Sequence, residues 1–468
     1  MRTTGNLLLR TDSYKFTHWK QYPPGTERVY SYFESRGGKW PDVVFFGLQY
    51  YLKKYLEGAV VSPAAIEEAE ELVGRHFADR SLFNRPGWEH ILKAHAGRLP
   101  VVIHAIPEGT PVPAHNVLMT VENTDPACWW LPNYLETLLV QVWYGCTVAT
   151  QSREMKKLIL KYLHDTGDPS LIELKLHDFG FRGVSSVETA GVGGAAHLLS
   201  FQGTDTFEGI MVARDYYGEP MAGFSIPAAE HSTITAWGQA HETEAMRNML
   251  DQYPQGTFAV VSDSYDVFAA CETIWGETLR DRVLARDGCV VIRADSGDPT
   301  TVLAAGTPNI LAILAAKFGY TINQKGYKVL NPHIRVIQSD GVDFEMLDSI
   351  LRATQKAGFS ADNIAFGSGG GLLQRLNRDT LKFAFKCAAV TVHGQDRDVF
   401  KNPVTDHEKR SKSGRMKLVK AQGLRGPTYQ TVKRDQPGED QLVEVFRDGE
   451  ILKDWTFSEV RRRAKTWV

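Results

Sequence analysis

In Thr257-Phe-Ala-Val-Val-Ser-Asp-Ser-Tyr-Asp266, a short apolar run stops abruptly at polar residues. The same pattern returns in residues 290–299, 336–341 and 364–371. Apolar runs of this length are typical of strands that are buried on both faces of a parallel sheet. In a parallel barrel the carboxyl ends of the strands converge on one mouth, and the chemistry of the fold takes place there.

The rest of the chain suggests how many such strands there are. Eight β-like segments, separated by helical patterns, lie near residues 174–178, 200–204, 222–226, 257–262, 289–294, 334–338, 363–367 and 383–391. This alternation predicts an α/β fold with a parallel sheet, and eight repeats predict an irregular (β/α)8-type barrel over residues 151–393. Residues 1–150 mix short strands with helices, which predicts an additional α+β domain. The polar segment 394–468 is too poor in apolar residues to fold alone, so we expect it to pack back on that N-terminal domain.

Composition and charge exclude several classes of protein. The 468 residues include 53 Lys and Arg and 55 Asp and Glu, a net charge of −2, so no global basic field attracts nucleic acid or an anionic membrane. The five cysteines show no CxxC spacing, which predicts reduced thiols and no zinc site. The apolar run Leu7–Leu9 ends at Arg10 and is too short for a signal peptide. We therefore expect a soluble, cytoplasmic protein.

Residues able to carry chemistry follow nearly every predicted strand. They are His177, Asp178, Asp205, Ser225, His231, Asp263, Arg293, Asp295, Asp298, Asp340 and the run Gly367–Gly371. Solvated loops do not require such regular placement, so we interpret the set as a catalytic mouth. Glycine N–H groups and arginine can bind phosphate, and carboxylates can bind Mg²⁺ or ribose hydroxyls. Each motif alone also fits a flexible or salt-bridged turn, and the glycine run matches no established nucleotide-binding pattern.

His231 precedes a clear helical pattern and therefore lies near a helix N-terminus. A single histidine is more often a packing or hydrogen-bonding residue than a catalyst. At a phosphate-binding mouth, however, a neutral imidazole could accept a phosphoryl group, and Asp263 at the next strand end could orient it.

Ten ungapped blocks, in order along nearly the whole chain, resemble the nicotinamide phosphoribosyltransferase family of type II phosphoribosyltransferases. The blocks are Thr11–Lys15, Lys20–Pro24, Tyr30–Glu34, Val121–Pro126, Lys175–Gly180, Arg182–Ser186, Gly203–Thr206, Pro227–Gly238, Val261–Asp266 and Gly367–Gln374. The resemblance implies a cytoplasmic homodimer of NAD salvage that joins nicotinamide to phosphoribosyl pyrophosphate (PRPP). It also implies Mg²⁺ as cofactor and ATP as a coupled substrate.

The resemblance also implies roles for single residues. Tyr14, from the second subunit, and Phe179 would sandwich the pyridine ring, with Arg182 beside it and Asp205 accepting a hydrogen bond from the carboxamide. His231 would be phosphorylated by ATP. Ribose and phosphate contacts are expected from Arg293, Asp295, Asp340, Gly369 and Gly370, and the strand-end residues His177 and Ser225 are expected beside the substrate. Basic residues around the pyrophosphate would be Arg36, Arg378, Lys386, Lys401 and Lys409.

Two departures and three rival functions stay open. Ser339 stands where the family pattern has glycine, and Ala259 stands where it has serine. The nearest rival is a nicotinate phosphoribosyltransferase, against which Gly203-Thr-Asp-Thr206 argues. An aldolase or sugar-phosphate isomerase needs other catalytic groups, and Lys386 is its nearest Schiff-base candidate. An extracellular signalling role fits poorly with unpaired cysteines and no signal peptide.

Overall fold

The computed structural model describes residues 5–405, 410–423 and 426–466. Contacts divide the chain into two units, each with its own sheet. The first, called here the N-terminal unit, contains residues 1–150, 215–219 and 377–466. The second, called here the parallel-sheet unit, contains residues 151–214 and 220–376.

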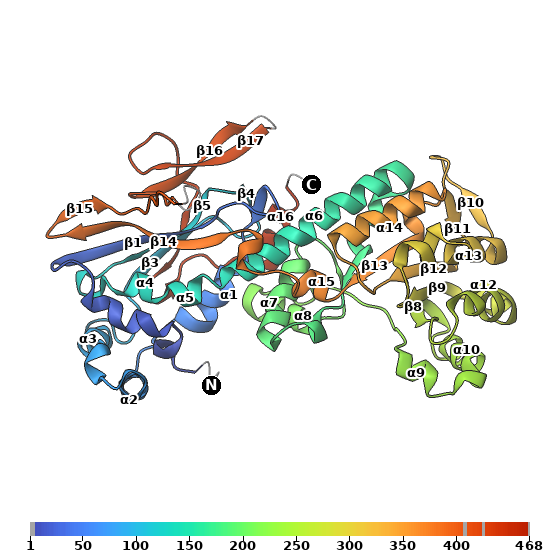
Figure 1. Cartoon of the computed structure of the whole chain (residues 1–468), viewed down its shortest axis with the longest axis horizontal. Coiled ribbons are helices and arrows are strands. Elements are labelled where there is room, and N and C mark those ends of the chain that lie inside the picture. Colours follow the sequence, from blue (N-terminus) through green and yellow to red (C-terminus); the bar gives the residue numbers. More distant parts are fainter. Residues whose placement is uncertain (1–4, 406–409, 424–425, 467–468) are drawn as a thin grey trace. The chain divides into compact units, whose positions relative to one another are not determined.

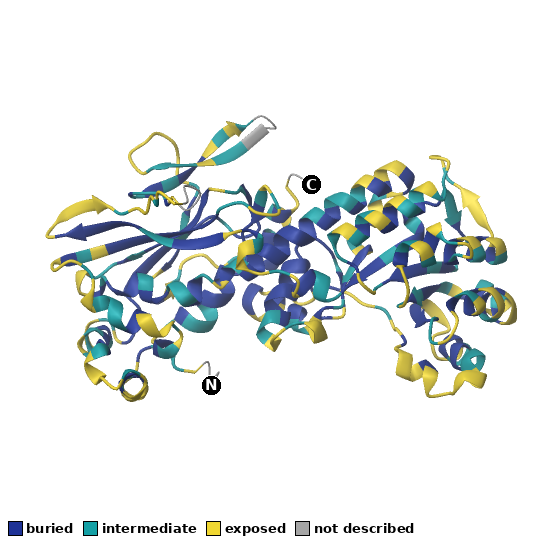
Figure 2. Ribbon diagram, in the orientation of Figure 1, coloured by how far each residue is buried: buried dark blue, intermediate teal, exposed yellow. Residues whose placement is uncertain are grey.

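A seven-stranded antiparallel sheet forms the centre of the N-terminal unit (Figure 1). Its order is β15 (Gln395–Asp398), β14 (Phe383–Val392), β1 (Thr26–Ser35), β5 (Val117–Asn123), β3 (Val101–Ala105), β18 (Val443–Arg447) and β19 (Glu450–Ile451). β1, β3 and β5 are buried along most of their length, as Figure 2 shows. Because β18 pairs with β3, the C-terminal segment completes a sheet that the N-terminal residues begin.

Short ribbons and helices complete this unit. The ribbons are β2 (Asp42–Val44) with β4 (Pro111–Pro113), and β16 (Met416–Gly423) with β17 (Gly426–Lys433). The helices are α1 (Leu48–Tyr51), α2 (Pro63–Phe77), α3 (Arg85–Ala94), α4 (Leu131–Tyr134), α5 (Glu136–Leu139) and α16 (Phe457–Ala464), and α6 (Val142–Thr166) begins here. α2 shows how the sequence sets a boundary, because Ser62 caps the Ala65 N–H and Pro63 occupies the first turn.

The parallel-sheet unit is built on six strands that all pair in parallel. Their order is β7 (Gly203–Thr204), β6 (Leu176–Asp178), β13 (Ile364–Ser368), β12 (Ile334–Gln338), β9 (Asp287–Ala294) and β8 (Gln255–Val261). The connecting helices are α7 (Val187–His197), α8 (Phe207–Tyr217), α9 (His231–Thr235), α10 (Glu242–Gln252), α11 (Val267–Ala269), α12 (Arg280–Leu284), α13 (Ile310–Phe318), α14 (Phe344–Lys356) and α15 (Gly370–Leu373), with a small ribbon of β10 (Tyr320–Ile322) and β11 (Lys328–Leu330). The expected mixed α/β fold is therefore present.

Two of the eight predicted barrel strands are wrong in detail. The segment 222–226 forms no strand, because it is held by a single bridge, between Phe224 and Gly203 of β7. Just beyond the segment, Ala228 makes another single parallel bridge, with Ala259 of β8. Pro227, between the two bridges, has no N–H to donate to a ladder.

The predicted eighth strand belongs to the other unit. β14 pairs antiparallel with β1 and is no part of the parallel sheet. A parallel crossover usually carries a full helix, whereas residues 369–382, between β13 and β14, form only the four-residue α15 and one 3₁₀ turn. The C-terminal part of the N-terminal unit thus begins at Asn377 rather than at residue 394.

One apolar stretch, Thr301–Phe318, is long and apolar enough to cross a membrane by composition alone. In the structure this stretch is interrupted at residues 306–309 and continues as α13. Ile310, Leu311 and Leu314 of α13 are fully buried. The apolar character of the stretch is therefore explained by the core of the parallel-sheet unit.

Candidate active site

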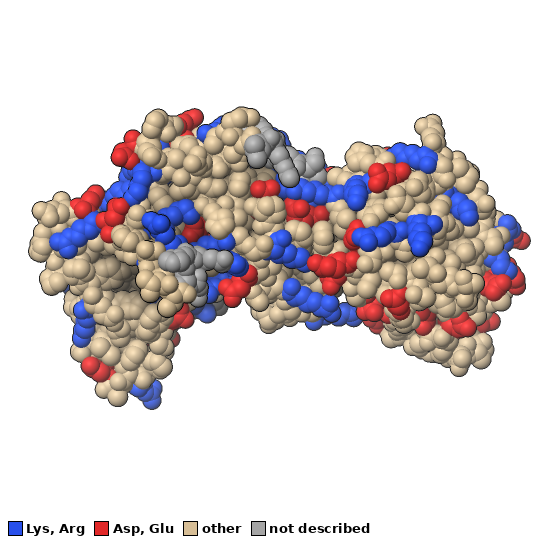
Figure 3. Space-filling view, turned by 45° about the horizontal axis from the view of Figure 1, so that its top comes forward, with Lys and Arg blue, Asp and Glu red and all other residues tan. Residues whose placement is uncertain are grey.

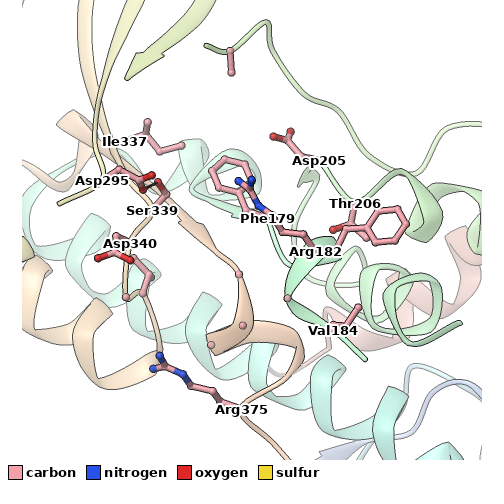
Figure 4. A pocket seen from close by; sticks show the side chains of 18 of the residues that line it. Phe179, Arg182, Val184, Asp205, Thr206, Asp295, Ile337, Ser339, Asp340 and Arg375 are labelled. Atoms are coloured by element: carbon pink, nitrogen blue, oxygen red, sulfur yellow. Dashed lines mark hydrogen bonds between the residues drawn. The ribbon is translucent and has the colours of Figure 1, made fainter. Parts of the chain in front are cut away.

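A cavity of about 970 Å³ opens at the carboxyl ends of the parallel strands (Figure 4). Its lining comes from the residues that follow five strands: Phe179 after β6, Asp205 and Thr206 after β7, Arg293 and Asp295 at β9, Ser339 to Val342 after β12, and Gly369 to Gly371 after β13. Residues 181–187 complete one wall, and Ala259 and Ile337 supply apolar surface. The expected convergence of strand ends on one mouth is thus present in this unit.

Phe179 stands at the centre of the cavity. Figure 4 shows Asp205, Thr206 and Arg182 on one side of its ring, and Asp295, Ser339 and Asp340 on the other. Its backbone N–H donates to the Ser368 carbonyl at 3.0 Å, which ties it to β13. A Cβ at Gly367 would lie only 2.2 Å from the ring, so this glycine leaves the space that the aromatic ring occupies. The cavity therefore presents a flat apolar face between two polar walls.

The first polar wall is a closed hydrogen-bonded triangle. Arg293 Nε donates to Ser339 Oγ at 2.8 Å, and Arg293 Nη2 donates to Asp295 Oδ2 at 2.8 Å. Ser339 Oγ donates in turn to Asp295 Oδ1 at 2.7 Å. Ser339, where the resemblance predicts a glycine, thus holds both charged groups.

Asp263 connects this wall to His231. Its Oδ2 accepts from the Asp295 N–H at 2.9 Å, and its Oδ1 lies 3.1 Å from His231 Nε2. The Asp263 side chain is 3% exposed, whereas that of His231 is 46% exposed and begins α9. A buried carboxylate therefore orients an accessible imidazole, although neither residue lines the cavity itself.

The second polar wall is formed by Asp205. Its N–H donates to the Asp178 carbonyl at 2.9 Å, and its Oδ1 accepts a hydrogen bond from Ser225 Oγ. Ser225 thus acts through Asp205 and is not part of the cavity lining. Arg182 lies on the 3₁₀ turn Phe181–Gly183 and is exposed on this side.

The glycine run serves several purposes. Nothing lies within 4 Å of a Cβ added at Gly370, so this backbone faces open space. A Cβ added at Gly371 would lie 2.6 Å from the Val342 carbonyl oxygen, too close for any side chain. α15 starts at Gly370, inside this run, and is only four residues long, so it contributes little dipole, and the backbone N–H groups at its start are what it offers an anion.

His177 and Asp178 lie behind the cavity wall. The centroid of the His177 ring is 6.1 Å from that of Phe179, and His177 Nε2 donates a hydrogen bond to the Leu174 carbonyl. Burial lowers the pKa of His177, so its neutral form is favoured. Burial raises the pKa of Asp178 to about 7, despite a hydrogen bond from the Gly180 N–H at 2.7 Å. Asp298 is also used structurally, since it accepts from the Thr301 N–H at 2.8 Å.

Arg375 and Thr206 line the cavity, although neither was among the predicted site residues. Arg375 lies four residues after the glycine run. A cation so close to a candidate phosphate-binding loop was a sequence signal for a site residue. The guanidinium is exposed and its ion pair with Asp343 is long, at 3.7 Å, which leaves it able to meet an anion.

The remaining predicted contacts belong to the N-terminal unit. Tyr14 lies on the 3₁₀ helix Ser13–Lys20 and is 56% exposed. Burial lowers the pKa of Lys386, and the nearby cations Arg36 and Lys401 lower it further, which identifies a basic cluster around β1 and β14. Arg378 begins a 3₁₀ turn of the same unit, and Lys409 lies outside the described residues. Elsewhere on the face shown in Figure 3, cationic and anionic side chains are interspersed.

Comparison with known proteins places the chain among the pyridine phosphoribosyltransferases. Residues 174–450 match the model of the nicotinate phosphoribosyltransferase (NAPRTase) family, and residues 6–103 match the model of the nicotinamide phosphoribosyltransferase N-terminal domain. The chain is 48% identical over 474 residues to the nicotinamide phosphoribosyltransferase of Xanthomonas campestris pv. campestris (strain 8004), covering 99% of both chains. It is 32% identical to the enzyme of that name from Acinetobacter baylyi, covering 98% of this chain and 97% of the relative.

Two crystal structures share the fold at low sequence identity. One is nicotinate-nucleotide pyrophosphorylase from Pyrococcus furiosus, with a TM-score of 0.62, 16% identity and coverage of 99% of this chain and 96% of that one. The other is human nicotinic acid phosphoribosyltransferase, with a TM-score of 0.56, 18% identity and coverage of 97% and 93%.

Proposed function

The chain belongs to the nicotinamide phosphoribosyltransferase family, and from this premise we propose that it transfers the phosphoribosyl group of PRPP to nicotinamide in NAD biosynthesis. The products are nicotinamide mononucleotide and pyrophosphate. One observation carries the assignment within the structure: a single cavity holds an aromatic ring between a carboxylate wall and a wall of arginine, carboxylate and glycine backbone. The wall formed by Asp205 suits a planar amide-bearing base, and the wall that contains Arg293 suits a sugar phosphate.

The proposed reaction needs alignment more than covalent help. The pyridine nitrogen lone pair forms a bond to C1 of the ribose, while the C1–O bond breaks and its electron pair leaves with pyrophosphate. Nicotinamide nitrogen is unprotonated at neutral pH, so no general base is required. Holding the two reactants in line can lower the barrier by roughly 7 kcal/mol or more, and fixed cations stabilise the departing charge.

We propose that Phe179 and the Asp205 wall bind the base, and that the wall containing Arg293 binds PRPP. Phe179 stacks on the pyridine ring, and Asp205, held by Ser225, accepts from the carboxamide. Arg293 and Asp340, with the backbone of Gly369 and Gly370, bind the ribose and its phosphate, and Arg375 adds a further cation.

Asp205 is the proposed determinant of base choice. An anionic acceptor favours the carboxamide NH₂ of nicotinamide and repels the carboxylate of nicotinate. This argument favours nicotinamide over the alternative, nicotinate phosphoribosyltransferase, although the family model over residues 174–450 carries the nicotinate name.

The donor set also fits Mg²⁺. Asp295 and Asp340 line the cavity and offer carboxylate oxygens, which are the ligands that Mg²⁺ prefers alongside substrate phosphates and water. When bound, the ion would neutralise negative charge on the pyrophosphate. Ser339 keeps Asp295 fixed in the position from which it would serve.

His231 is the proposed acceptor of the ATP γ-phosphoryl group, which would couple ATP hydrolysis to synthesis. Its Nε2 faces Asp263, so Nδ1 is the nitrogen that remains to attack phosphorus. The P–O bond to ADP would break as the N–P bond forms, and water would later release phosphate. Incubation with γ-labelled ATP should label the wild type and not His231→Gln, and labelling of that variant would exclude this role.

We further propose that the enzyme is a cytoplasmic homodimer. Tyr14 is exposed in its own subunit and would reach the base of the partner's site, and the basic cluster of Arg36, Lys386 and Lys401 would meet pyrophosphate. The aldolase alternative is not favoured, because none of the cavity-lining residues among those described is a lysine.

A direct assay tests the assignment. The protein is mixed with PRPP, Mg²⁺ and either nicotinamide or nicotinate, with and without ATP, and the mononucleotides are separated by chromatography. We expect nicotinamide mononucleotide as the main product. In Asp205→Ser, kcat/KM for nicotinamide should fall about 10- to 100-fold, as expected for loss of a hydrogen bond to a charged group. Ser225→Ala, which retains the carboxylate, should lose less. Equal use of both bases by the wild type would contradict the role of Asp205.

A further inference from the structure

Two histidines, an aspartate and a cysteine meet in the N-terminal unit, and none of them lines the proposed phosphoribosyl cavity. His90 lies on α3 and His95 is the residue that ends it. Asp125 caps the 3₁₀ turn Pro126–Cys128, and Cys128 closes that turn. The four potential ligand atoms all lie within 4.8 Å of one another.

The two imidazoles converge on one oxygen atom. His90 Nε2 lies 2.7 Å and His95 Nε2 lies 2.6 Å from the same Oδ2 of Asp125. The other carboxylate oxygen accepts from the Ala127 N–H at 2.8 Å, and the Asp125 carbonyl accepts from Asn123 at 2.8 Å. Asp125 is therefore held rigidly, and the Nε2 atoms of His90 and His95 already lie next to its Oδ2 atom.

We propose that His90, His95, Asp125 and Cys128 form a structural site for one divalent transition-metal ion, with Zn²⁺ the best-matched ion. Imidazole, thiolate and carboxylate are the ligands that zinc takes in four-coordinate sites. Bond lengths of about 2.0–2.3 Å to zinc place ligand atoms roughly 3.3–3.8 Å apart in a tetrahedron. Ligand atoms no more than 4.8 Å apart reach that spacing by small side-chain rotations.

The chemistry of the cluster suits a cation. One carboxylate oxygen of Asp125 meets both imidazoles, and the Cys128 sulfur lies beside them. A bound metal ion favours the deprotonated form of a cysteine ligand, so it would join this thiol to the other three groups.

The surroundings fit a structural role. His90 is 39% exposed and His95 25% exposed, so an ion can enter from solvent, whereas Cys128 is fully buried. The ion would join the end of α3 to the turn after β5, two segments about thirty residues apart in sequence. The prediction of no zinc site came from missing CxxC spacing. Here the ligand pairs are instead His-x₄-His and Asp-x₂-Cys, and only folding brings them together.

Metal binding to the full-length chain tests this site. The protein is stripped with a chelator, titrated with Zn²⁺ and analysed for metal content after gel filtration. We expect about one zinc per chain and a rise in the unfolding temperature of a few degrees. Titration with Co²⁺ should give intense visible absorption of a four-coordinate ion and a sulfur-to-metal charge-transfer band in the near ultraviolet.

Matched variants locate the ion. Cys128→Ser and His95→Gln should lose the bound zinc and the thermal shift, and Cys128→Ser should also lose the charge-transfer band. His76→Gln, on the exposed end of α2, and Cys289→Ser, in the parallel-sheet unit, should bind as the wild type does. Circular dichroism checks that each variant folds. If a ligand variant does not fold, the cobalt spectrum of the wild type still shows whether a sulfur atom binds the ion. No binding by the wild type, a spectrum without sulfur, or zinc retained by folded Cys128→Ser would overturn the proposal.

Discussion

At the residue scale, Ser339 stands where the resemblance predicts a glycine, and its side chain makes contacts that a glycine could not make. Its hydroxyl joins Arg293 and Asp295, while the direct contact between those two remains without it. The hydroxyl therefore adds rigidity to a pair that already exists.

Replacing Ser339 with glycine should loosen this pair. We expect KM for PRPP to rise by roughly 3- to 10-fold, as for loss of about one neutral hydrogen bond, with a smaller change in kcat. Steady-state kinetics with varied PRPP measures this. Ser339→Ala separates the hydroxyl from backbone freedom, because it removes the oxygen and retains Cβ. Unchanged KM in both variants would show that the hydroxyl does not organise the phosphate wall.

Asp178 makes stability depend on pH. Its pKa rises from 3.8 in the unfolded chain to about 7 in the folded protein, mainly through burial, which corresponds to about 4 kcal/mol between the two protonation states. Because the folded state retains the proton more tightly, this contribution is fully present below about pH 4 and is lost as the pH rises through about 7.

Asp178→Asn should therefore remove part of the pH dependence. The amide oxygen can still accept from the Gly180 N–H, and no charge develops. Relative to the wild type, we expect the variant to gain stability between about pH 5 and pH 8. Urea unfolding across this range measures the difference, and the comparison cancels other titrating groups. Parallel pH curves for the two proteins would contradict a protonated Asp178.

At the scale of the element, strand β13 illustrates how a glycine makes room for an aromatic ring on the neighbouring segment. The ring of Phe179, which follows β6, lies where a side chain at Gly367 would be. β6 and β13 are neighbours in the sheet, with Gly367 opposite His177 in the register.

Gly367→Ala should displace the ring that forms the centre of the cavity. A shift of about 1 Å can reduce kcat/KM by roughly 100-fold, so we expect a loss of about 10- to 100-fold with little change in ATP hydrolysis. A double-mutant cycle provides the control: the loss in unfolding temperature caused by Gly367→Ala should disappear when Phe179→Ala is also present. Additive effects would mean that the two residues do not collide.

Prediction from sequence worked best for elements whose ends carry unusual residues. The strands near 257–262, 289–294, 334–338 and 363–367 are present as β8, β9, β12 and β13. The prediction of a strand at 222–226 was wrong, because this segment forms a single bridge and no ladder. Prediction also failed for the partner of β14, since a buried strand carries no local signal of the sheet it will join.

At the scale of the whole molecule, the N-terminal unit is assembled from segments far apart in the chain. β1 pairs with β14, and β3 pairs with β18, so residues beyond 376 are needed to complete the sheet. The proposal that two subunits share each active site also concerns the whole molecule. Tyr14 belongs to the N-terminal unit, and Phe179 belongs to the parallel-sheet unit.

Subunit mixing tests that proposal. Tyr14→Ala and Arg293→Ala should each lose about 10-fold or more in kcat/KM as pure proteins. In mixed dimers, one site combines an intact Tyr14 from one subunit with an intact Arg293 from the other. If subunits pair at random, half of the dimers are mixed, and each mixed dimer has one intact site of two. Co-expression should therefore restore up to about a quarter of wild-type activity. Mixtures no more active than the separate variants would exclude a site built by two subunits.

The residues themselves determined which chemistry this chain can perform. Local sequence patterns determine the order of strands and helices, the charged strand ends and the family blocks. Such patterns can be recognised without a structure. Tertiary structure alone decided which sheet β14 joins, that Ser339 links Arg293 to Asp295, and that His90, His95, Asp125 and Cys128 meet. These outcomes depend on distances between residues remote along the chain, and such distances exist only after the core has packed.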